Sequence, residues 1–285
     1  MKKIVLVPNP KKDIGFSVTE RVIGKLSSLG LDILCDQKYA MLEAFGVTLY
    51  TELPSDADAI VVIGGDGSVI DASTIAVALD IPLLGINLGK VGYLSVVDSD
   101  AIDVLDSLVS GEYKVEDKFL LSAGKIDASG CVITCEHKAV NDVVISHDNY
   151  LGISDILLEN STGDKLEYRA DGVIVSTPVG STAYSLSTGG PIISHSLDSI
   201  SVTPICPHSF FSRTIVYAPS EEIIITNNGD NALNISVDGR FFDKLSCGES
   251  CAVYKSNKRL KMIVFSENNM FSVLFKKIKV LEDKV

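Results

Sequence analysis

The sequence predicts an α/β N-terminal domain built on a parallel sheet, followed by an all-β, sandwich-like C-terminal domain. Up to about residue 110, short apolar segments alternate with segments of helical periodicity, as in βαβ units. From about residue 111, β-type segments follow one another and are separated by Gly, Asn, Asp and Ser, which is typical of a sandwich. We therefore expect an α/β domain over residues 1–110 and a β-rich domain that binds the ligand over residues 111–285.

The first half contains one clear helical pattern and four apolar segments. Residues 18–29 carry apolar side chains at helical spacing and are followed by Gly30, a favoured helix end. The apolar segments lack alternation with polar residues, so we expect strands that are buried on both faces. These strands are predicted at residues 4–7, 31–34, 59–63 and 82–86.

The second half is predicted to be β-rich. Its β-type segments are rich in branched aliphatic residues and end at turn-forming residues. They lie at residues 140–146, 154–159, 172–176, 222–226, 233–237 and 260–265.

Composition excludes several classes of partner. The chain has 285 residues and a formal net charge of −12, so a nucleic acid or an anionic membrane would meet an acidic field. No apolar run approaches the roughly 18 residues that cross a bilayer, and the N-terminal segment is unlike a signal peptide. We expect a cytoplasmic protein with no nucleic-acid or membrane partner.

Two cysteine pairs share one spacing, Cys131 with Cys135 and Cys247 with Cys251. Four thiolates could in principle hold zinc. The pairs lie in β-like stretches, however, where residues four apart share one face of a strand. We expect free thiols and no metal site formed by protein groups alone.

The segment Gly64-Gly65-Asp66-Gly67-Ser68 lies where a buried strand ends and a helix begins. Glycines at this place let the backbone approach a phosphate, and the helix start offers N–H donors. The loop lacks the lysine of a P-loop. It therefore predicts phosphate binding of another kind.

An acidic residue inside a loop built for anions is unusual. Asp66 could be a turn or helix-cap residue. Alternatively, its carboxylate could act as the base for an attacking hydroxyl or steer a metal ion beside the phosphates. The residue alone does not decide between these interpretations.

The second half adds a polar region that suits a ribose-phosphate ligand. Asn141 and Asp142 lie at a predicted strand, and a further strand leads into a run of Ser, Thr and Gly that continues to Pro191. Such a run offers many hydroxyl and amide groups with little bulk.

Together these segments resemble the NAD kinase family, and the resemblance covers most of the chain. It rests on the Gly-Gly-Asp-Gly-Ser loop, residues 85–94, Asn141-Asp142, residues 171–191, residues 204–209 and residues 236–239. A Gly-Gly-Asp-Gly loop alone is shared with diacylglycerol kinases, sphingosine kinases and phosphofructokinases. Three residues depart from the family pattern: Ser68 and Val179 stand where Thr is more usual, and Asp142 stands where Glu is usual.

The resemblance implies a role for each matching residue. In the first domain it implies that Asp66 is the base or orienting group for the ribose 2′-hydroxyl, that Tyr93 packs on a ring of the dinucleotide, and that the phosphate path is lined by Gly64, Gly65, Gly67 and Ser68. In the second domain it implies that ribose hydroxyls are held by Asn141 and Asp142. A purine or the nicotinamide would be surrounded by Asp171, Thr182, Ala183 and Tyr184, with Ser187 nearby. The resemblance also implies that Arg169 bears on the choice between NAD and NADH and that Asp238 belongs to the site.

The activity that the resemblance implies is phosphoryl transfer to the adenosine-ribose 2′-hydroxyl of NAD, which gives NADP. It also implies ATP or polyphosphate as donor, Mg²⁺ or another divalent cation, a ligand in a crevice between the domains, and a homodimer or homotetramer. We weigh two alternatives, a lipid kinase of the diacylglycerol or sphingosine type and a non-catalytic dinucleotide-binding sensor. A lipid kinase should carry a basic, apolar membrane face, and a sensor should have lost Asp66.

Overall fold

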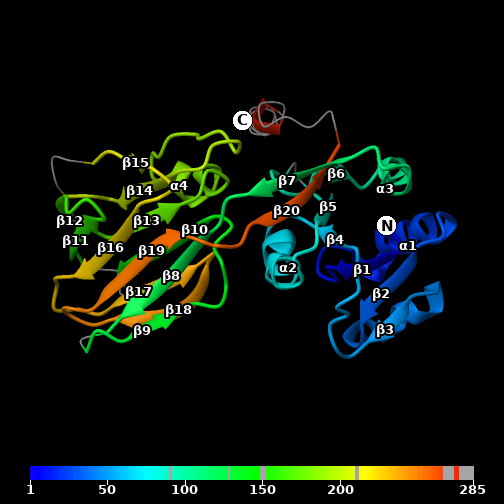
Figure 1. Cartoon of the computed structure of the whole chain (residues 1–285), viewed down its shortest axis with the longest axis horizontal. Helices are drawn as coiled ribbons and strands as arrows, with labels where there is room; N and C mark the ends of the chain where they lie inside the picture. The colour runs from blue at the N-terminus through cyan, green and yellow to red at the C-terminus, as the bar shows by residue number, and fades with distance from the viewer. Residues whose placement is uncertain (90–91, 128, 148–151, 209–211, 266–272, 276–285) are drawn as a thin grey trace. The chain divides into compact units, whose positions relative to one another are not determined.

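A computed structural model describes residues 1–89, 92–127, 129–147, 152–208, 212–265 and 273–275. Lys90, Val91 and Ser209, which belong to the segments named above, lie outside the described residues. The chain divides into two compact units. The first comprises Met1–Asp117 with Leu260–Val285, and the second comprises Lys118–Arg259 (Figure 1).

The first unit is an α/β structure around a mostly parallel sheet. Its strand order is β3-β2-β1-β4-β5-β20-β7, and β6 pairs with β5. The strands are β1 (Lys3–Pro8), β2 (Asp32–Asp36), β3 (Thr48–Tyr50), β4 (Ala59–Gly64), β5 (Leu83–Asn87), β6 (Val97–Asp98), β7 (Lys114–Lys118) and β20 (Leu260–Val264). The helices are α1 (Ser17–Ser28), α2 (Asp66–Leu79) and α3 (Ser107–Ser110), with short 3₁₀ helices η1 (Ile14–Phe16), η2 (Gln37–Phe45) and η3 (Ile102–Asp106).

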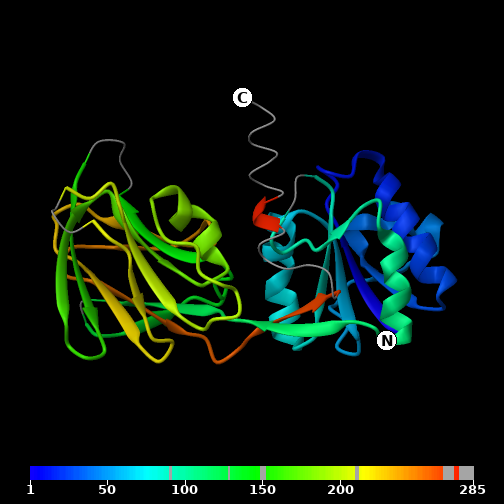
Figure 2. The same ribbon diagram turned by 90° about the horizontal axis from the view of Figure 1, so that it is seen from above.

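Helices cover both faces of this sheet (Figure 2). Alternate residues of β1 and β4, such as Ile4 and Val61, pack in one apolar cluster with Leu26 of α1 and Leu108 of α3. The helix α2 packs against β4 and β5 on the opposite face. Both faces are therefore buried, which explains why β4 is apolar without alternation.

The predicted elements of the first half are confirmed, and no end is shifted by more than two residues. The helix α1 begins at Ser17 because the Asp13 carboxylate accepts hydrogen bonds from the N–H groups of Val18 and Thr19, at 3.2 and 2.7 Å. It ends before Gly30, which has a φ of +73°. A positive φ is accessible to glycine at little cost, as the sequence predicted.

One strand lies in a different place from the prediction. The segment 260–265 was expected in the β-rich domain, but β20 pairs with β5 in parallel, with Met262 opposite Leu83. The first unit therefore consists of two segments of the chain: one ends at Asp117, where the prediction had 110, and the other begins at Leu260. Met262 and Ile263 are buried there, so the apolar pattern of this strand satisfies the α/β sheet equally well.

The second unit is a sandwich of two antiparallel six-stranded sheets. One has the order β15-β14-β13-β10-β17-β18 and the other β12-β11-β16-β19-β8-β9. The strands are β8 (Leu121–Ile126), β9 (Val132–Thr134), β10 (Asp142–His147), β11 (Ser154–Asn160), β12 (Lys165–Ala170), β13 (Gly172–Ser176), β14 (Ile200–Ile205), β15 (Ile215–Tyr217), β16 (Glu222–Asn227), β17 (Leu233–Val237), β18 (Arg240–Leu245) and β19 (Ser250–Lys255). Two short helices, η4 (Gly180–Thr182) and α4 (Tyr184–Ser187), follow β13.

The core of this unit lies between its two sheets. Val143 and Val173 of one sheet share an apolar cluster with Ile156, Ile223 and Val253 of the other. The strand β11 alternates between buried and more exposed residues, as a strand with one inward face should. The predicted sandwich is confirmed.

The register of three strands positions the polar region. Asp142 pairs with Ser176 across β10 and β13, and Val143 pairs with Val237 across β10 and β17. Because these pairs are antiparallel, the start of β10 lies beside the ends of β13 and β17. Residues 177–180 and Asp238 thus meet the Asn141-Asp142 segment at one end of these three inner strands.

The cysteine prediction is wrong in one respect. Cys135 and Cys251 are buried, whereas Cys131 and Cys247 are exposed, so neither pair shares a face. The reason is that Cys131 and Cys135 flank the short strand β9 and Cys247 precedes β19, so that of these four only Cys251 lies within a strand. All six cysteines are free.

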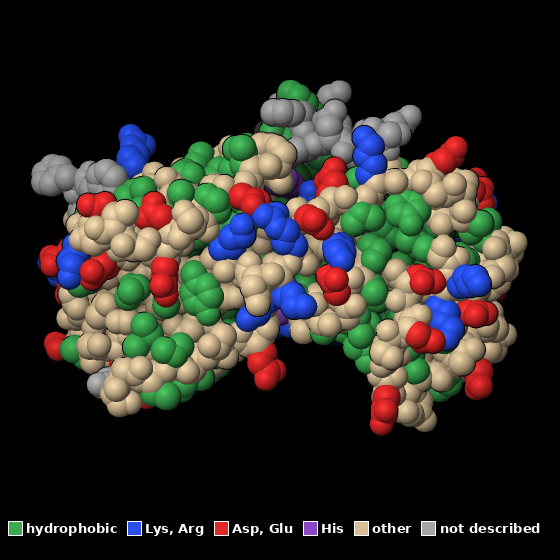
Figure 3. All heavy atoms as spheres, viewed as in Figure 1, with side chains coloured by type: hydrophobic (Ala, Val, Ile, Leu, Met, Phe, Trp, Pro, Cys, Tyr) green, Lys and Arg blue, Asp and Glu red, His purple; other side chains and the backbone are tan. Residues whose placement is uncertain are grey.

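Within the described residues, no helix is long and apolar enough to span a membrane. The same residues contain no group of three or more His, Cys, Asp or Glu side chains that could hold a metal ion. Acidic and basic side chains are interspersed over the face shown in Figure 3.

Candidate active site

The predicted phosphate loop forms at the carboxyl end of β4. Gly65 is the N-cap of α2, and the Ser68 N–H donates to the Gly65 carbonyl at 2.8 Å. A Cβ on Gly64 would collide with the Ser68 side chain, so only glycine fits there. The Ser68 hydroxyl also accepts a hydrogen bond of 2.7 Å from the Asn9 amide, which ties the loop to the end of β1. Gly67 is exposed on the first turn of α2.

The Asp66 carboxylate binds the backbone of a neighbouring segment. Its oxygens accept hydrogen bonds from the N–H groups of Tyr93, Leu94 and Ser95, at 2.9, 3.0 and 3.1 Å. Gly92 also lies against this carboxylate, where a Cβ would collide with it. Asp66 therefore fixes the path of residues 92–95, a role that neither sequence interpretation included.

Tyr93 belongs to the segment that Asp66 holds in place. Its backbone N–H is held by Asp66, and the residue is half-buried. Burial, followed by the charge of Asp66, raises the pKa of the Tyr93 phenol. Tyr93 and the phosphate loop thus belong to one hydrogen-bonded group in the first unit.

In the second unit, Asp238 organises the Asn141-Asp142 segment. One Asp238 oxygen accepts hydrogen bonds from the N–H groups of Asn141 and Asp142, at 2.8 and 3.1 Å. The other accepts from the Val140 N–H at 2.8 Å and lies 2.9 Å from His137 Nε2. The Asp238 side chain is 0 % exposed. Its carboxylate is therefore a support for the segment, and ligand contact falls to the residues that it holds.

The opposite side of this segment is held by the residues after β13. The Thr177 N–H donates to the Asn141 carbonyl at 2.9 Å, and the Thr177 hydroxyl donates to the Val140 carbonyl at 2.6 Å. Gly180 packs so closely on the Asn141 backbone that a Cβ would overlap it. The backbone of Asn141 is thus fixed from both sides.

Asp142 carries an unusual carboxyl group. It is buried, and burial followed by the charge of Asp238 raises its pKa from 3.8 to about 7. The Tyr184 phenol feels the charges of Asp142 and Asp171, among others, and its pKa is raised chiefly by burial. Asp142 and Asp171 themselves lie at opposite ends of the β10–β13 pair, with Asp142 opposite Ser176 and Asp171 directly before Gly172.

The raised pKa of Asp142 predicts a pH-dependent stability. Because the folded pKa lies above the unfolded one, Asp142 costs no stability below about pH 4, and its penalty grows until the pH passes about 7. Each unit of difference between the folded and unfolded pKa changes the free energy of unfolding by about 1.4 kcal/mol. We expect Asp142→Asn to raise the melting temperature more at about pH 8 than at about pH 5. Thermal unfolding of both proteins checks this, with the exposed Asp230→Asn as control; an equal gain at both pH values would contradict it.

The remaining predicted residues occupy varied positions. Asp171 lies just before β13, with its carboxylate 3.6 Å from His147 Nε2. The Thr182 hydroxyl donates to the Val179 carbonyl at 3.0 Å, and the Ala183 N–H donates to the Gly180 carbonyl at 2.9 Å. Tyr184 and Ser187 bound the short helix α4, and both are exposed. The Thr182 and Ala183 contacts show local turn structure, so their contact with a purine or nicotinamide stays a prediction.

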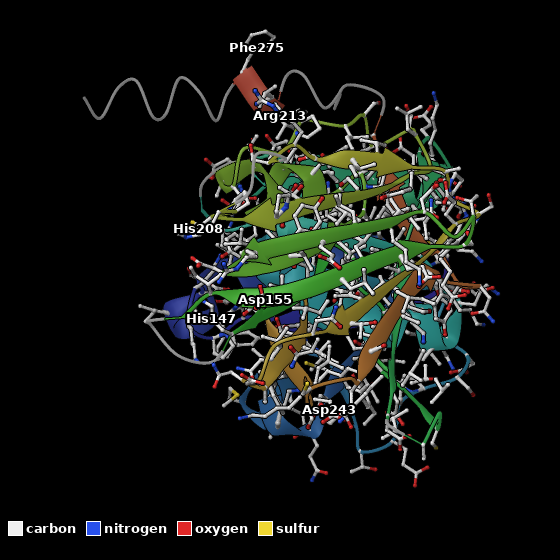
Figure 4. The ribbon with its side chains drawn as sticks, turned by 90° about the vertical axis from the view of Figure 1, so that its left-hand side faces the viewer. His147, Asp155, His208, Arg213, Asp243 and Phe275 are labelled. Carbon is white, nitrogen blue, oxygen red and sulfur yellow. The ribbon has the colours of Figure 1, made fainter. Side chains whose placement is uncertain are left out.

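Arg169 lies on β12 and pairs across the sheet with Asp155 of β11. Its Nε is 3.0 Å from an Asp155 oxygen, and the two side chains are 67 % and 51 % exposed. Asp155 is labelled in Figure 4. This contact is that of a solvent-exposed cross-strand ion pair, and a role in choosing between NAD and NADH remains a prediction.

Several residues that support the site are not among those that the sequence singles out. Asn9 follows a buried strand directly, and this position is a signal for a residue at the ligand-binding end of the sheet. Thr177 stands in the sequence as one member of a polar run. His137 gave no signal, because its partner Asp238 is 101 positions away.

The first unit thus presents a glycine loop at the start of a helix, which suits phosphate groups, and the second presents a polar segment fixed by hydrogen bonds. The model of the ATP-NAD kinase N-terminal domain matches residues 4–113, and that of the ATP-NAD kinase C-terminal domain matches residues 140–265. The NAD kinase of Geobacter sulfurreducens is 35% identical over 282 residues, with 98% of this chain and 99% of the relative covered. The chain belongs to the NAD kinase family.

A second relative supports the family, and two solved structures support the fold. The NAD kinase of Thermoanaerobacter sp. strain X514 is 33% identical over 284 residues, covering 98% of this chain and 99% of the relative. The crystal structure of yeast NADH kinase complexed with NADH has a TM-score of 0.84 at 24% identity, covering 96% of this chain and 86% of that one. An NAD kinase from Archaeoglobus fulgidus in complex with ATP has a TM-score of 0.74 at 22% identity, covering 96% and 99%. At these identities the two structures bear on the fold alone.

Proposed function

We propose that this protein is an NAD kinase that transfers a phosphoryl group from ATP to the adenosine-ribose 2′-hydroxyl of NAD and so makes NADP. The observation that carries the proposal is the Gly64-to-Ser68 loop, which opens α2 at the carboxyl end of a buried parallel strand in a chain that matches the family over both units. The lipid kinase and the sensor receive no support from the comparisons.

The geometry suits the binding of different parts of the substrates by the two units. Backbone N–H groups at the start of α2 suit the phosphates of the donor. Asn141 and Asp142, fixed by Asp238 and Thr177, suit ribose hydroxyls. Phosphoryl transfer needs mainly positioning and charge neutralisation, and a site of fixed backbone groups provides the positioning.

Asp66 is the proposed orienting group or base for the 2′-hydroxyl. Three N–H bonds hold its carboxylate in one orientation at the phosphate loop. A carboxylate fixed in this way can accept a hydrogen bond from a hydroxyl with little loss of conformational freedom, which is the advantage of a preorganised site.

Mg²⁺ or another divalent cation is the proposed cofactor, arriving with the donor. The described residues offer no cluster of three acidic, His or Cys side chains, so a cage made by the protein alone does not fit. Mg²⁺ commonly binds through substrate phosphates and one or two carboxylates, and Asp66 is the carboxylate inside the loop. When bound, the ion would offset phosphate charge.

We expect NADP formation from NAD and ATP to stop when a chelator in excess removes the divalent cation, because the phosphate charge is then no longer neutralised. A coupled assay with ATP, other triphosphates and polyphosphate checks this and identifies the donor. Readdition of Mg²⁺ is the control. Undiminished turnover with the chelator present would contradict the proposed cofactor.

The proposal includes three further features: the location, the assembly and a second donor. The exposed free thiols of Cys131, Cys206 and Cys247 fit a reducing compartment, so the cytoplasm is the proposed location. Assembly into a homodimer or homotetramer is what family membership implies, and sedimentation of the purified protein tests it. Polyphosphate as a second donor is tested by the donor panel.

A further inference from the structure

Lys12 reaches the phosphate loop from the segment that follows β1. The residue lies in the segment between β1 and η1 and is exposed. Its ammonium nitrogen occupies the space that a Cβ on Gly65 would need, and its Cε lies 3.7 Å from the same position. Gly65 therefore leaves room for the lysine side chain beside the first turn of α2.

The backbone under Lys12 is fixed to the loop by several hydrogen bonds. The Asn9 N–H donates to the Ile63 carbonyl at 2.9 Å, and the Lys12 N–H donates to the Asn9 carbonyl at 3.1 Å. The Asn9 amide donates to Ser68 Oγ at 2.7 Å. All of these residues belong to the first unit, so the placement of Lys12 does not depend on the second.

Lys12 lacks a protein counter-ion among the described residues. No carboxylate there lies within ion-pair distance of it, whereas Lys3, Lys25 and Lys38 each have an acidic partner. The acidic residue of the loop, Asp66, is bound to the N–H groups of residues 93–95. A lysine beside a glycine loop and a helix start, without a carboxylate of its own, adds positive charge where the donor phosphates are expected.

We propose that Lys12 binds the phosphate chain of the phosphoryl donor across Gly65. It would supply from the β1 loop the charge that a P-loop lysine supplies from within the loop itself. This inference rests on the proposed kinase function, and it identifies a donor-binding residue that the Gly-Gly-Asp-Gly motif does not contain. The ligand class is a nucleoside triphosphate or another polyanionic phosphate.

The test compares Lys12→Gln with Lys11→Gln in the full chain. Lys11 is the matched control, because it is the adjacent exposed lysine and contacts Asn9 through its backbone N–H. We expect Lys12→Gln to raise the KM for ATP on the order of 10- to 100-fold, the scale of a lost hydrogen bond to a charged group. The KM for NAD should change by less than about twofold, and Lys12→Arg should restore much of the loss, since Arg keeps the charge.

Titration of ATP into the unreacted protein separates this inference from the proposed function. If the wild-type protein makes no NADP, the proposed function fails, yet weaker ATP binding by Lys12→Gln alone would still support the lysine. If Lys12→Gln and Lys11→Gln bind ATP equally well, the inference is overturned. If Lys12→Gln weakens NAD and ATP equally, Lys12 acts on the structure of the loop and the inference is likewise overturned.

Discussion

Asp66→Asn is expected to lower kcat for NADP formation by about 10²- to 10⁴-fold, the usual scale for loss of a general base or orienting carboxylate. The substitution preserves the shape of the side chain and removes its charge. Asp66 lies in the phosphate loop, and no other acidic residue lies in that loop. Steady-state kinetics with saturating ATP and NAD measure the effect.

The contacts of Asp66 add a second expected effect. An Asn amide keeps one acceptor oxygen but turns an NH₂ group toward N–H donors, so the three bonds to Tyr93, Leu94 and Ser95 cannot all persist. We therefore expect weaker NAD binding as well, through movement of Tyr93. Asp71→Asn is the matched control, because Asp71 is an exposed carboxylate on the same helix. If Asp66→Asn retained the wild-type kcat, Asp66 would have no part in the chemistry.

Asp238→Ala is expected to give the largest loss of NAD affinity outside the phosphate loop. It leaves the N–H groups of Val140, Asn141 and Asp142 without their acceptor. Buried donors left unsatisfied cost on the order of 1 to 3 kcal/mol each, so we expect the free energy of unfolding to fall by roughly 3 kcal/mol. The Kd for NAD should rise at least about tenfold.

Calorimetric titration and thermal unfolding measure both effects of Asp238→Ala. The Kd for ATP should stay unchanged, because the phosphate loop lies in the other unit. Asp230→Ala, at an exposed turn residue of the same unit, is the control. Wild-type NAD affinity in Asp238→Ala, with ATP affinity also unchanged, would mean that the Asn141-Asp142 segment does not need this support.

The elements with strong local signals could be predicted from the sequence. The helix α1 shows its spacing and its glycine end, and β4 shows an unbroken apolar run. The strand β20 shows only that it is apolar. Its pairing of Met262 with Leu83 joins segments far apart in the chain, and an apolar run fits either sheet. The sequence therefore predicts that this segment is a strand, but not which sheet the strand joins.

The candidate site shows the same limit. The glycines and Asp66 could be found because the loop is continuous in sequence. The partners of Asp66 are 27 to 29 positions away, and those of Asp238 are 96 to 101 positions away. Asp238 and Gly239 have φ of 49° and 74°, as expected for an Asp-Gly turn between β17 and β18. The turn could be predicted, but the carboxylate's reach to residues 140–142 could not.

The identity of the phosphorylated product tests the proposed function most directly. The purified protein, with NAD, ATP and Mg²⁺, is followed by chromatographic separation of nucleotides and by an NADP-specific dehydrogenase. We predict that NADP and ADP form in equal amounts and that the phosphate is on the 2′-hydroxyl of the adenosine ribose. ADP formation without NADP, or phosphate transfer to diacylglycerol or sphingosine instead of NAD, would contradict the proposed function.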